Sequence, residues 1–201
     1  MIVAGCGGSK AAEPAPPSTS PPPQPAAQTP AKRPRIYTKA ELARLVLQPK
    51  DSPADMRYVK GESGPKTLEQ IGFILPRQVK EMRSYGLRAV RDEVFAAKSS
   101  QSDRRVAERV WLLKNASSAS RWLSRSKDDS TGLGFSQIVP TGFGDESWSA
   151  SGQAAGGAVV SHAFRLGNAV FVVTSFSARE QLSPAAARAA AAAALARARK
   201  V

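Results

Sequence analysis

Residues 158–176 read AVVSHAFRLGNAVFVVTSF, which is two runs of strand-forming residues joined by the dipeptide Gly167-Asn168. A two-residue Gly-Asn connection favours a tight β-hairpin, because positive φ angles there match the twist of antiparallel strands. The predicted cross-strand pairs are Phe164–Phe171, His162–Val173 and Val160–Ser175 on one face, and Arg165–Val170, Ala163–Val172 and Val159–Phe176 on the other. Both faces are largely apolar, so we expect helices or long loops to cover each face of the sheet.

Helix signals lie on both sides of this hairpin. Thr38 and Glu41 form a capping box before an apolar stripe that ends at Pro49. Ser183 and Pro184 provide the cap and first residue of an alanine-rich helix that we expect to dock across the sheet. Further helices are predicted over 67–86, where Pro76 either kinks one helix or begins a second, and over 116–126 after the cap residue Asn115.

Strand signals complete the pattern. The remaining strands are predicted over 87–96, 104–113, 134–140 and 146–151, with the polar segment 98–103 as a hairpin loop. Helices interleaved with antiparallel hairpins predict an α+β fold, with a sheet of about five or six strands and helices packed on it. An α/β/α layering is one form of this arrangement.

The N-terminal segment indicates where the protein resides. Cys6 is the one cysteine of the chain and follows Val3-Ala4-Gly5, which has the form of a bacterial lipobox whose cysteine becomes diacylated. Only five residues precede Cys6, so we expect the basic and apolar parts of a secretory signal upstream of this sequence. The alternative is a free thiol on a cytoplasmic tail.

A proline-rich stretch follows the cysteine. Residues 11–34 hold nine of the fifteen prolines, and such a segment favours an extended, solvated spacer over helix or strand. We therefore divide the chain into a residual signal and lipobox (1–6), a disordered linker (7–35) and a single α+β domain (36–201). Such a spacer suits a domain held away from a membrane to which Cys6 is anchored.

Charge gives a positive hint about partners. The chain carries 29 Lys and Arg against 16 Asp and Glu, a net charge of +13, which favours anionic partners such as nucleic acid, phospholipid headgroups or acidic wall polymers. The expected partner is an anionic envelope polymer or a protein. The excess is concentrated in residues 48–127, although such runs are commonly only solvated surface. The candidate anion-binding residues are Arg77, Lys80, Arg83, Arg88, Arg91, Arg104, Arg105 and Arg109.

Candidate catalytic groups are few. One His and one Cys exclude a zinc site built from several such ligands, and no cofactor or catalytic motif occurs. His162 and Ser161 are neighbours on a strand and point to opposite faces, so we expect a core histidine with satisfied nitrogens. The acidic pairs Asp128-Asp129 and Asp145-Glu146 are expected in turns with structural roles. The three tryptophans, expected in the core, are Trp111, Trp122 and Trp148.

Three stretches carry a family resemblance: ELARLVLQPKDSPADMRY (41–58), VPTGFGDESWSASG (139–152) and AVVSHAFRLGNAVFVV (158–173). With the lipobox and linker, they resemble uncharacterised secreted lipoproteins of actinobacteria, in which Gly-x-Gly-Asp-Glu and Arg-x-Gly-Asn turns recur. Here these turns are Gly142 to Glu146 and Arg165 to Asn168, whereas the first stretch departs from the usual Asp-Leu-Pro-x-Gly form. The resemblance covers most of residues 36–178, implies a shared fold and carries no known activity.

These features favour a lipid-anchored protein on the extracytoplasmic face of the cell membrane, with a non-catalytic binding or interaction domain and no cofactor. One alternative is an envelope enzyme of the hydrolase type that uses carboxylates or His162. The other is a cytoplasmic nucleic-acid-binding protein, which the charge supports although no recognition motif does.

Overall fold

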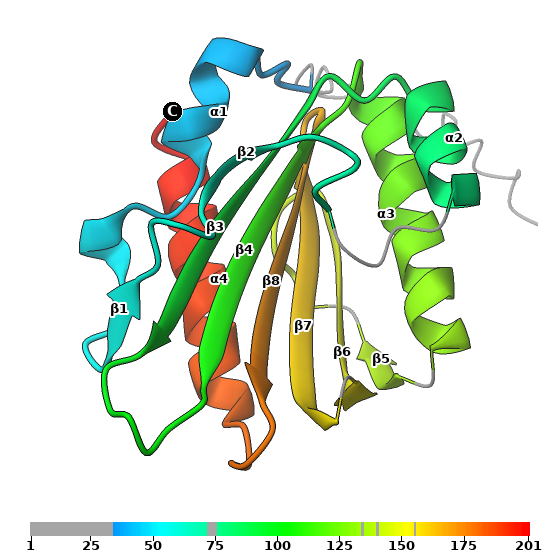
Figure 1. Ribbon diagram of the computed structural model, residues 1–201. Coiled ribbons are helices and arrows are strands. Elements are labelled where there is room, and N and C mark those ends of the chain that lie inside the picture. The colour runs from blue at the N-terminus through cyan, green and yellow to red at the C-terminus, as the bar shows by residue number, and fades with distance from the viewer. Residues whose placement is uncertain (1–33, 72–75, 134, 140, 155) are drawn as a thin grey trace, which may run out of the picture. The chain divides into compact units, whose positions relative to one another are not determined.

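The computed structural model describes residues 34–71, 76–133, 135–139, 141–154 and 156–201, with the backbone alone at 76–78, 137–139 and 154 (Figure 1). Cys6 and most of the predicted linker lie outside the described residues. The described strands form one antiparallel sheet in the order β1-β3-β4-β8-β7-β6-β5, with β2 also paired to β3. The strands are β1 (Met56–Tyr58), β2 (Gly64–Lys66), β3 (Ala89–Ala97), β4 (Arg105–Leu112), β5 (Ser136–Val139), β6 (Glu146–Ala154), β7 (Gly157–Leu166) and β8 (Ala169–Ser177).

Helices cover both faces of this sheet (Figure 1). α1 (Lys39–Leu45) and α4 (Pro184–Ala198) pack on one face, while α2 (Pro76–Ser84) and α3 (Ala116–Gly132) lie on the other. A short 3-10 turn, η1 (Pro49–Asp51), follows α1. The predicted α+β class is confirmed, and the layering is α/β/α. The described sheet has eight strands rather than five or six, because the three-residue strands β1 and β2 add to the edge of β3.

The β7–β8 hairpin has the predicted register. Phe164 pairs with Phe171, His162 with Val173 and Ala163 with Val172. Gly167 has a φ of +54°, in the left-handed region, and a Cβ there would lie 1.8 Å from the carbonyl oxygen of Arg35. Glycine is therefore required both by the turn and by the chain that passes over it.

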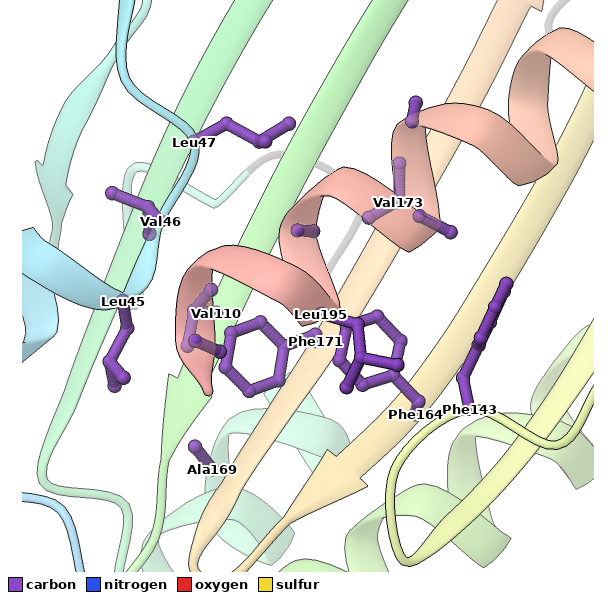
Figure 2. Close-up of a cluster of buried hydrophobic side chains, with 14 of the residues drawn as sticks. Leu45, Val46, Leu47, Val110, Phe143, Phe164, Ala169, Phe171, Val173 and Leu195 are labelled. Atoms are coloured by element: carbon purple, nitrogen blue, oxygen red, sulfur yellow. The ribbon is translucent and has the colours of Figure 1, made fainter. Parts of the chain in front are cut away.

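The alternation of side chains along the strands gives one large core on each face, and a third, small cluster contains Val160, Leu182 and Ala187. On the α4 face, Phe164 and Phe171 stack with ring centroids 4.8 Å apart beneath α4 (Figure 2). On the α3 face, Trp111, Trp122 and Trp148 are all buried, which confirms their assignment to the core. The apolar pattern on both faces of the hairpin is thus explained by one helical layer on each side.

The helix boundaries follow the predicted caps. The Thr38 N–H donates to Glu41 Oε2 at 2.8 Å before α1, and the Ser118 N–H donates to Asn115 Oδ1 at 2.8 Å in the first turn of α3. Ser183 caps α4, and Pro184 is its first residue.

The predicted helix over 67–86 is shorter in the structure. Thr67 and Gln70 do make the hydrogen bonds of a capping box, at 3.0 and 3.3 Å, but the described residues there form only a turn. α2 begins at Pro76, as one of the two alternatives predicted, and Gly86 follows the helix with a φ of +69°. A proline lacks the N–H that an interior helical position needs, so it fits at the first position.

Candidate functional site

An apolar pocket lies beside α4, on the face of β4 and β8 that this helix covers. It has a volume of about 280 Å³. Its floor includes Val106 and Ser175, one pair of neighbours across β4 and β8. Its walls are α4 and the segment between α1 and β1, contributed by Leu47, Pro53, Met56, Leu182, Ala186, Ala189, Ala190 and Ala193.

Alanine explains why this pocket exists. α4 presents Ala186, Ala189, Ala190 and Ala193 to the pocket, and each contributes a single methyl group. A helix with leucines at these positions would fill the space between itself and the loop opposite, as core helices ordinarily do. The same alanines favour the helical conformation, so the sequence combines a stable helix with an unfilled wall.

A buried carboxyl group lies behind the pocket. Glu108 is fully buried, and its Oε2 accepts a hydrogen bond of 2.6 Å from the N–H of the pocket residue Leu47. Its Oε1 has no hydrogen-bond partner among the described residues. Burial, with smaller contributions from Glu93 and from Asp51 of the pocket, raises the pKa of Glu108 to about 8. Glu108 is therefore mainly uncharged at neutral pH.

The pocket lining includes the carboxylate of Asp51, which accepts the Gln48 N–H at 2.8 Å, and two arginines that have carboxylate partners. Arg104 is paired with Asp55, and its Nε lies 3.3 Å from Glu180 Oε2. Arg105 is paired with Glu62. Because each rim guanidinium already has a carboxylate, the pocket offers apolar contact more than a free charge.

A second concave region is basic. Two adjoining depressions share Lys66 and Arg88 and lie between the start of α1, the β2–β3 edge and the end of α2. We call this region the basic groove, and its cations are Lys39, Lys66, Arg83, Arg88 and Arg91.

The structure thus brings together only part of the predicted anion-binding set. Arg83, Arg88 and Arg91 line the basic groove, with Lys39 and Lys66, which sequence reasoning missed. Those two lysines are separated from the arginines in the chain, and only the β2–β3 pairing and the packing of α1 bring them close.

The other predicted cations lie elsewhere. Arg104 and Arg105 stand at the rim of the apolar pocket. Arg109 lies on the α3 face, where its Nε and Nη2 are each 2.7 Å from the carboxylate of Asp92. Lys80 is exposed on α2, and the side chain of Arg77 lies outside the described residues.

His162 is buried as predicted, but the expectation that its nitrogens are satisfied is wrong. Neither Nδ1 nor Nε2 has a hydrogen-bond partner among the described residues. The ring instead packs edge-on against Phe143, with centroids 6.0 Å apart. Burial, and secondarily the charge of Arg188, lowers the pKa of His162. Ser161 bonds Thr174 at 3.0 Å in the neighbouring strand, so the two residues form no catalytic pair.

The Asp145-Glu146 turn has the structural role expected of it. Arg165 donates to Asp145 Oδ2 at 2.9 Å and to Glu146 Oε1 at 2.9 Å, and the Gly167 N–H donates to Asp145 at 2.9 Å. The Gly-x-Gly-Asp-Glu and Arg-x-Gly-Asn turns are thus partners in one corner of the sheet. Both carboxylates are occupied by structural contacts.

The acidic pair Asp128-Asp129 was predicted in a turn, and that prediction is wrong. Both residues lie in α3, where Asp129 forms an i,i+4 ion pair of 3.2 Å with Arg125. The helix runs further than the predicted 116–126 because this pair and the backbone bonds of its last turn continue it.

In the described part of the chain, no group of three or more His, Cys, Asp or Glu side chains has the arrangement of a metal site.

Comparison with known proteins places the fold. No protein-family model and no curated protein matches the chain. Among solved structures, the chain is similar to the extracellular domain of PknH from Mycobacterium tuberculosis, with a TM-score of 0.61 and 14% sequence identity. The alignment covers 83% of this chain and 99% of that one. At this identity the likeness establishes a shared fold.

Within the described residues, no helix combines the length and apolar character that crossing a membrane requires.

Proposed function

We propose that this protein is a lipid-anchored, extracytoplasmic binding domain that holds an apolar ligand group in the alanine-walled pocket beside α4. The pocket is the observation that carries the proposal: about 280 Å³ of preformed concave space lined mainly by apolar side chains. An enclosed apolar pocket with a few polar groups is the usual form of a small-molecule site.

The surroundings of the pocket favour a ligand whose buried part is uncharged. The rim arginines Arg104 and Arg105 already have carboxylate partners, and the buried Glu108 is protonated at neutral pH. Ser175 and Ser183 are the small polar side chains in the lining. A hydrocarbon chain or ring would gain about 25 cal/mol for each Å² of apolar surface it buries there.

A binding role without catalysis is supported by the state of the candidate catalytic groups. Asp145 and Glu146 are engaged by Arg165 and the backbone of Gly167. His162 lies in the core against Phe143, and neither of its ring nitrogens has a hydrogen-bond partner among the described residues. These arrangements favour binding over an enzyme of the hydrolase type.

The extracytoplasmic location rests on two observations. Val3-Ala4-Gly5-Cys6 has the form of a lipobox and precedes a proline-rich segment. The fold is similar to a domain described as extracellular, that of PknH. Mass spectrometry of the native protein tests this part: a diacylated Cys6 in the membrane fraction is expected, and an unmodified thiol in a cytosolic fraction would contradict it.

Binding at the pocket is tested with an uncharged fluorescent probe, N-phenyl-1-naphthylamine. We expect saturable binding by the wild-type protein and its loss in the double variant Ala189→Leu/Ala193→Leu, whose added side chains occupy the pocket. Both alanines are exposed on α4 and line the pocket, so the larger residues do not overpack the core.

The matched control is Ala192→Leu/Ala196→Leu, which adds the same two side chains to exposed positions of α4 outside the pocket. This control should bind the probe as the wild type does. Equal binding by all three proteins would show that the probe binds elsewhere and would remove the main support for the proposed site.

A further inference from the structure

The basic groove is separate from the apolar pocket and shares no lining residue with it. One wall is the first part of α1, with Lys39, Leu42 and Ala43. The opposite wall is the β2–β3 edge with Lys66 and Arg88, and the groove continues to Arg83 at the end of α2. Cations therefore stand on both walls and at the α2 end, and the lining between them includes apolar groups.

Three of the five cations have no counter-charge. Arg91 is held by the buried Glu93 at 2.6 Å, and Arg83 lies 3.7 Å from Glu69 in an exposed pair. Among the described residues, no carboxylate pairs with Lys39, Lys66 or Arg88, and residues 72–78 contribute no acidic side chain. The groove is thus a concentration of uncompensated positive charge in a protein whose total charge is +13.

We propose that the basic groove binds a linear polyanion that carries repeated phosphate groups. A concave path with cations on opposing walls suits a chain, because successive phosphates can meet Lys39 on one wall and Lys66 and Arg88 on the other. The apolar floor, which includes Val90 and Leu87, suits the carbon backbone of a polymer whose phosphates face the walls.

Attraction of this kind is recognised by its salt dependence. Each cation that neutralises a phosphate releases condensed counterions, so the logarithm of the binding constant falls linearly with the logarithm of the salt concentration. For a flexible single-chain polyanion, three contacts contribute about two to this slope.

The test measures binding of long-chain inorganic polyphosphate by the full-length protein over a range of salt concentrations. The groove variant is Lys39→Gln/Lys66→Gln/Arg88→Gln. The matched control, Lys50→Gln/Lys127→Gln/Lys200→Gln, removes three exposed cations of η1, α3 and the end of the chain. Equal thermal melting of the three proteins establishes that each is folded.

We expect the groove variant to bind polyphosphate at least about tenfold more weakly than the wild type, with the salt slope reduced by about two. The control should keep its affinity to within a small factor. The proposal is overturned if the wild type does not bind polyphosphate, or if both triple variants lose affinity equally. It is also overturned if the groove residues are needed for phosphatidylglycerol vesicles and not for polyphosphate, because the surface would then serve the membrane.

Discussion

Glu93 and Glu108 lie directly opposite each other on β3 and β4, and both are buried on the α4 face of the sheet. Their surroundings differ. Glu93 receives hydrogen bonds from Arg91 and from the Tyr58 hydroxyl, at 2.6 and 2.7 Å, whereas among the described residues Glu108 accepts one only from the Leu47 N–H. Two like charges facing each other in a core would repel strongly, and the pair avoids this because the pKa of Glu108 is raised to about 8.

The raised pKa predicts that folding stability falls as pH rises. The unfolded chain releases the Glu108 proton near pH 4.5, whereas the folded protein retains it up to about pH 8. Between these values the unfolded state binds fewer protons, so stability decreases with pH by up to about 1.4 kcal/mol per pH unit. Glu108→Gln keeps an acceptor for the Leu47 N–H without an ionisable group, so its stability should not show this decline.

Urea unfolding of both proteins between pH 5 and pH 8 measures the difference. The control Glu62→Gln removes an exposed carboxylate and should keep the wild-type pH dependence of stability. A Glu108→Gln protein whose stability declines with pH as steeply as the wild type would rule out a protonated Glu108.

Asn168 predicts a second, local effect on stability. Its side chain accepts from the Tyr37 N–H at 2.6 Å and donates to the carbonyl oxygens of Tyr37 and Leu113, at 3.1 and 2.8 Å. Asn168→Ala leaves these buried backbone groups unpaired, at a cost of about 2–4 kcal/mol. Hydrogen exchange at the Tyr37 amide should accelerate more than the global loss of stability explains.

The comparison is Asn115→Ala, which removes the N-cap of α3 at an exposed position. Loss of such a cap costs about 1 kcal/mol. If Asn168→Ala is no more destabilising than Asn115→Ala, then the side chain of Asn168 does not hold the start of the domain.

The predictable parts of this fold are those with strong local signals. The Gly167-Asn168 turn fixes the β7–β8 register, since the two-residue loop leaves one pairing for every residue that follows. β1 and β2 give no such signal: they are three residues long, β2 contains Pro65, and only the edge of β3 gives them a ladder. The Thr67–Gln70 capping box was misleading because its hydrogen bonds also stabilise an isolated turn.

The functional surfaces were less predictable than the fold. The arginine spacing indicated a basic region, but Arg109 is held by Asp92. The two lysines of the basic groove, Lys39 and Lys66, are distant in the chain from its arginines, so their spacing gave no signal. The apolar pocket depends on the absence of side-chain volume on α4. An alanine repeat signals a helix in sequence, and only the packing of that helix against β4, β8 and the loop opposite reveals the space it leaves.

Gly144 and Gly142 illustrate two different reasons why a position requires glycine, a positive φ angle and a lack of space for a Cβ. Both have positive φ angles, +62° and +73°. A Cβ at residue 144 would lie 2.2 Å from the carbonyl oxygen of Arg165, whereas one at residue 142 meets nothing within 4 Å. Gly142→Ala should therefore cost only the conformational strain, about 1–2 kcal/mol, and Gly144→Ala should cost distinctly more.

Urea unfolding of the two variants at one pH measures this difference directly. The excess at residue 144 reflects displacement of the Arg165 carbonyl, which accepts the Asp145 N–H at 2.8 Å. Equal losses of stability for Gly142→Ala and Gly144→Ala would indicate that the Arg165 carbonyl can be displaced without a measurable loss of stability. The close contact of Gly144 with Arg165 would then not be the reason for glycine at this position.

His162 predicts a loss of stability at acidic pH, opposite in direction to the effect of Glu108. Because burial and Arg188 lower the pKa of His162 below its ordinary 6.5, the unfolded chain takes up a proton before the folded protein does. The contribution of His162 to stability is therefore full above pH 6.5 and is lost as pH falls below it. The two effects overlap between pH 5 and pH 6.5, so the measurement is made in the Glu108→Gln background.

In that background, urea unfolding should show stability declining as pH falls below 6.5. His162→Leu in the same background should flatten that decline, although it changes the absolute stability. Arg188→Gln should make the acidic loss of stability smaller. It removes the positive charge of Arg188, which lowers the pKa of His162 in the folded protein. An acidic decline that persists unchanged in the His162→Leu protein would assign it to other groups and show that protonation of this buried ring is not coupled to folding.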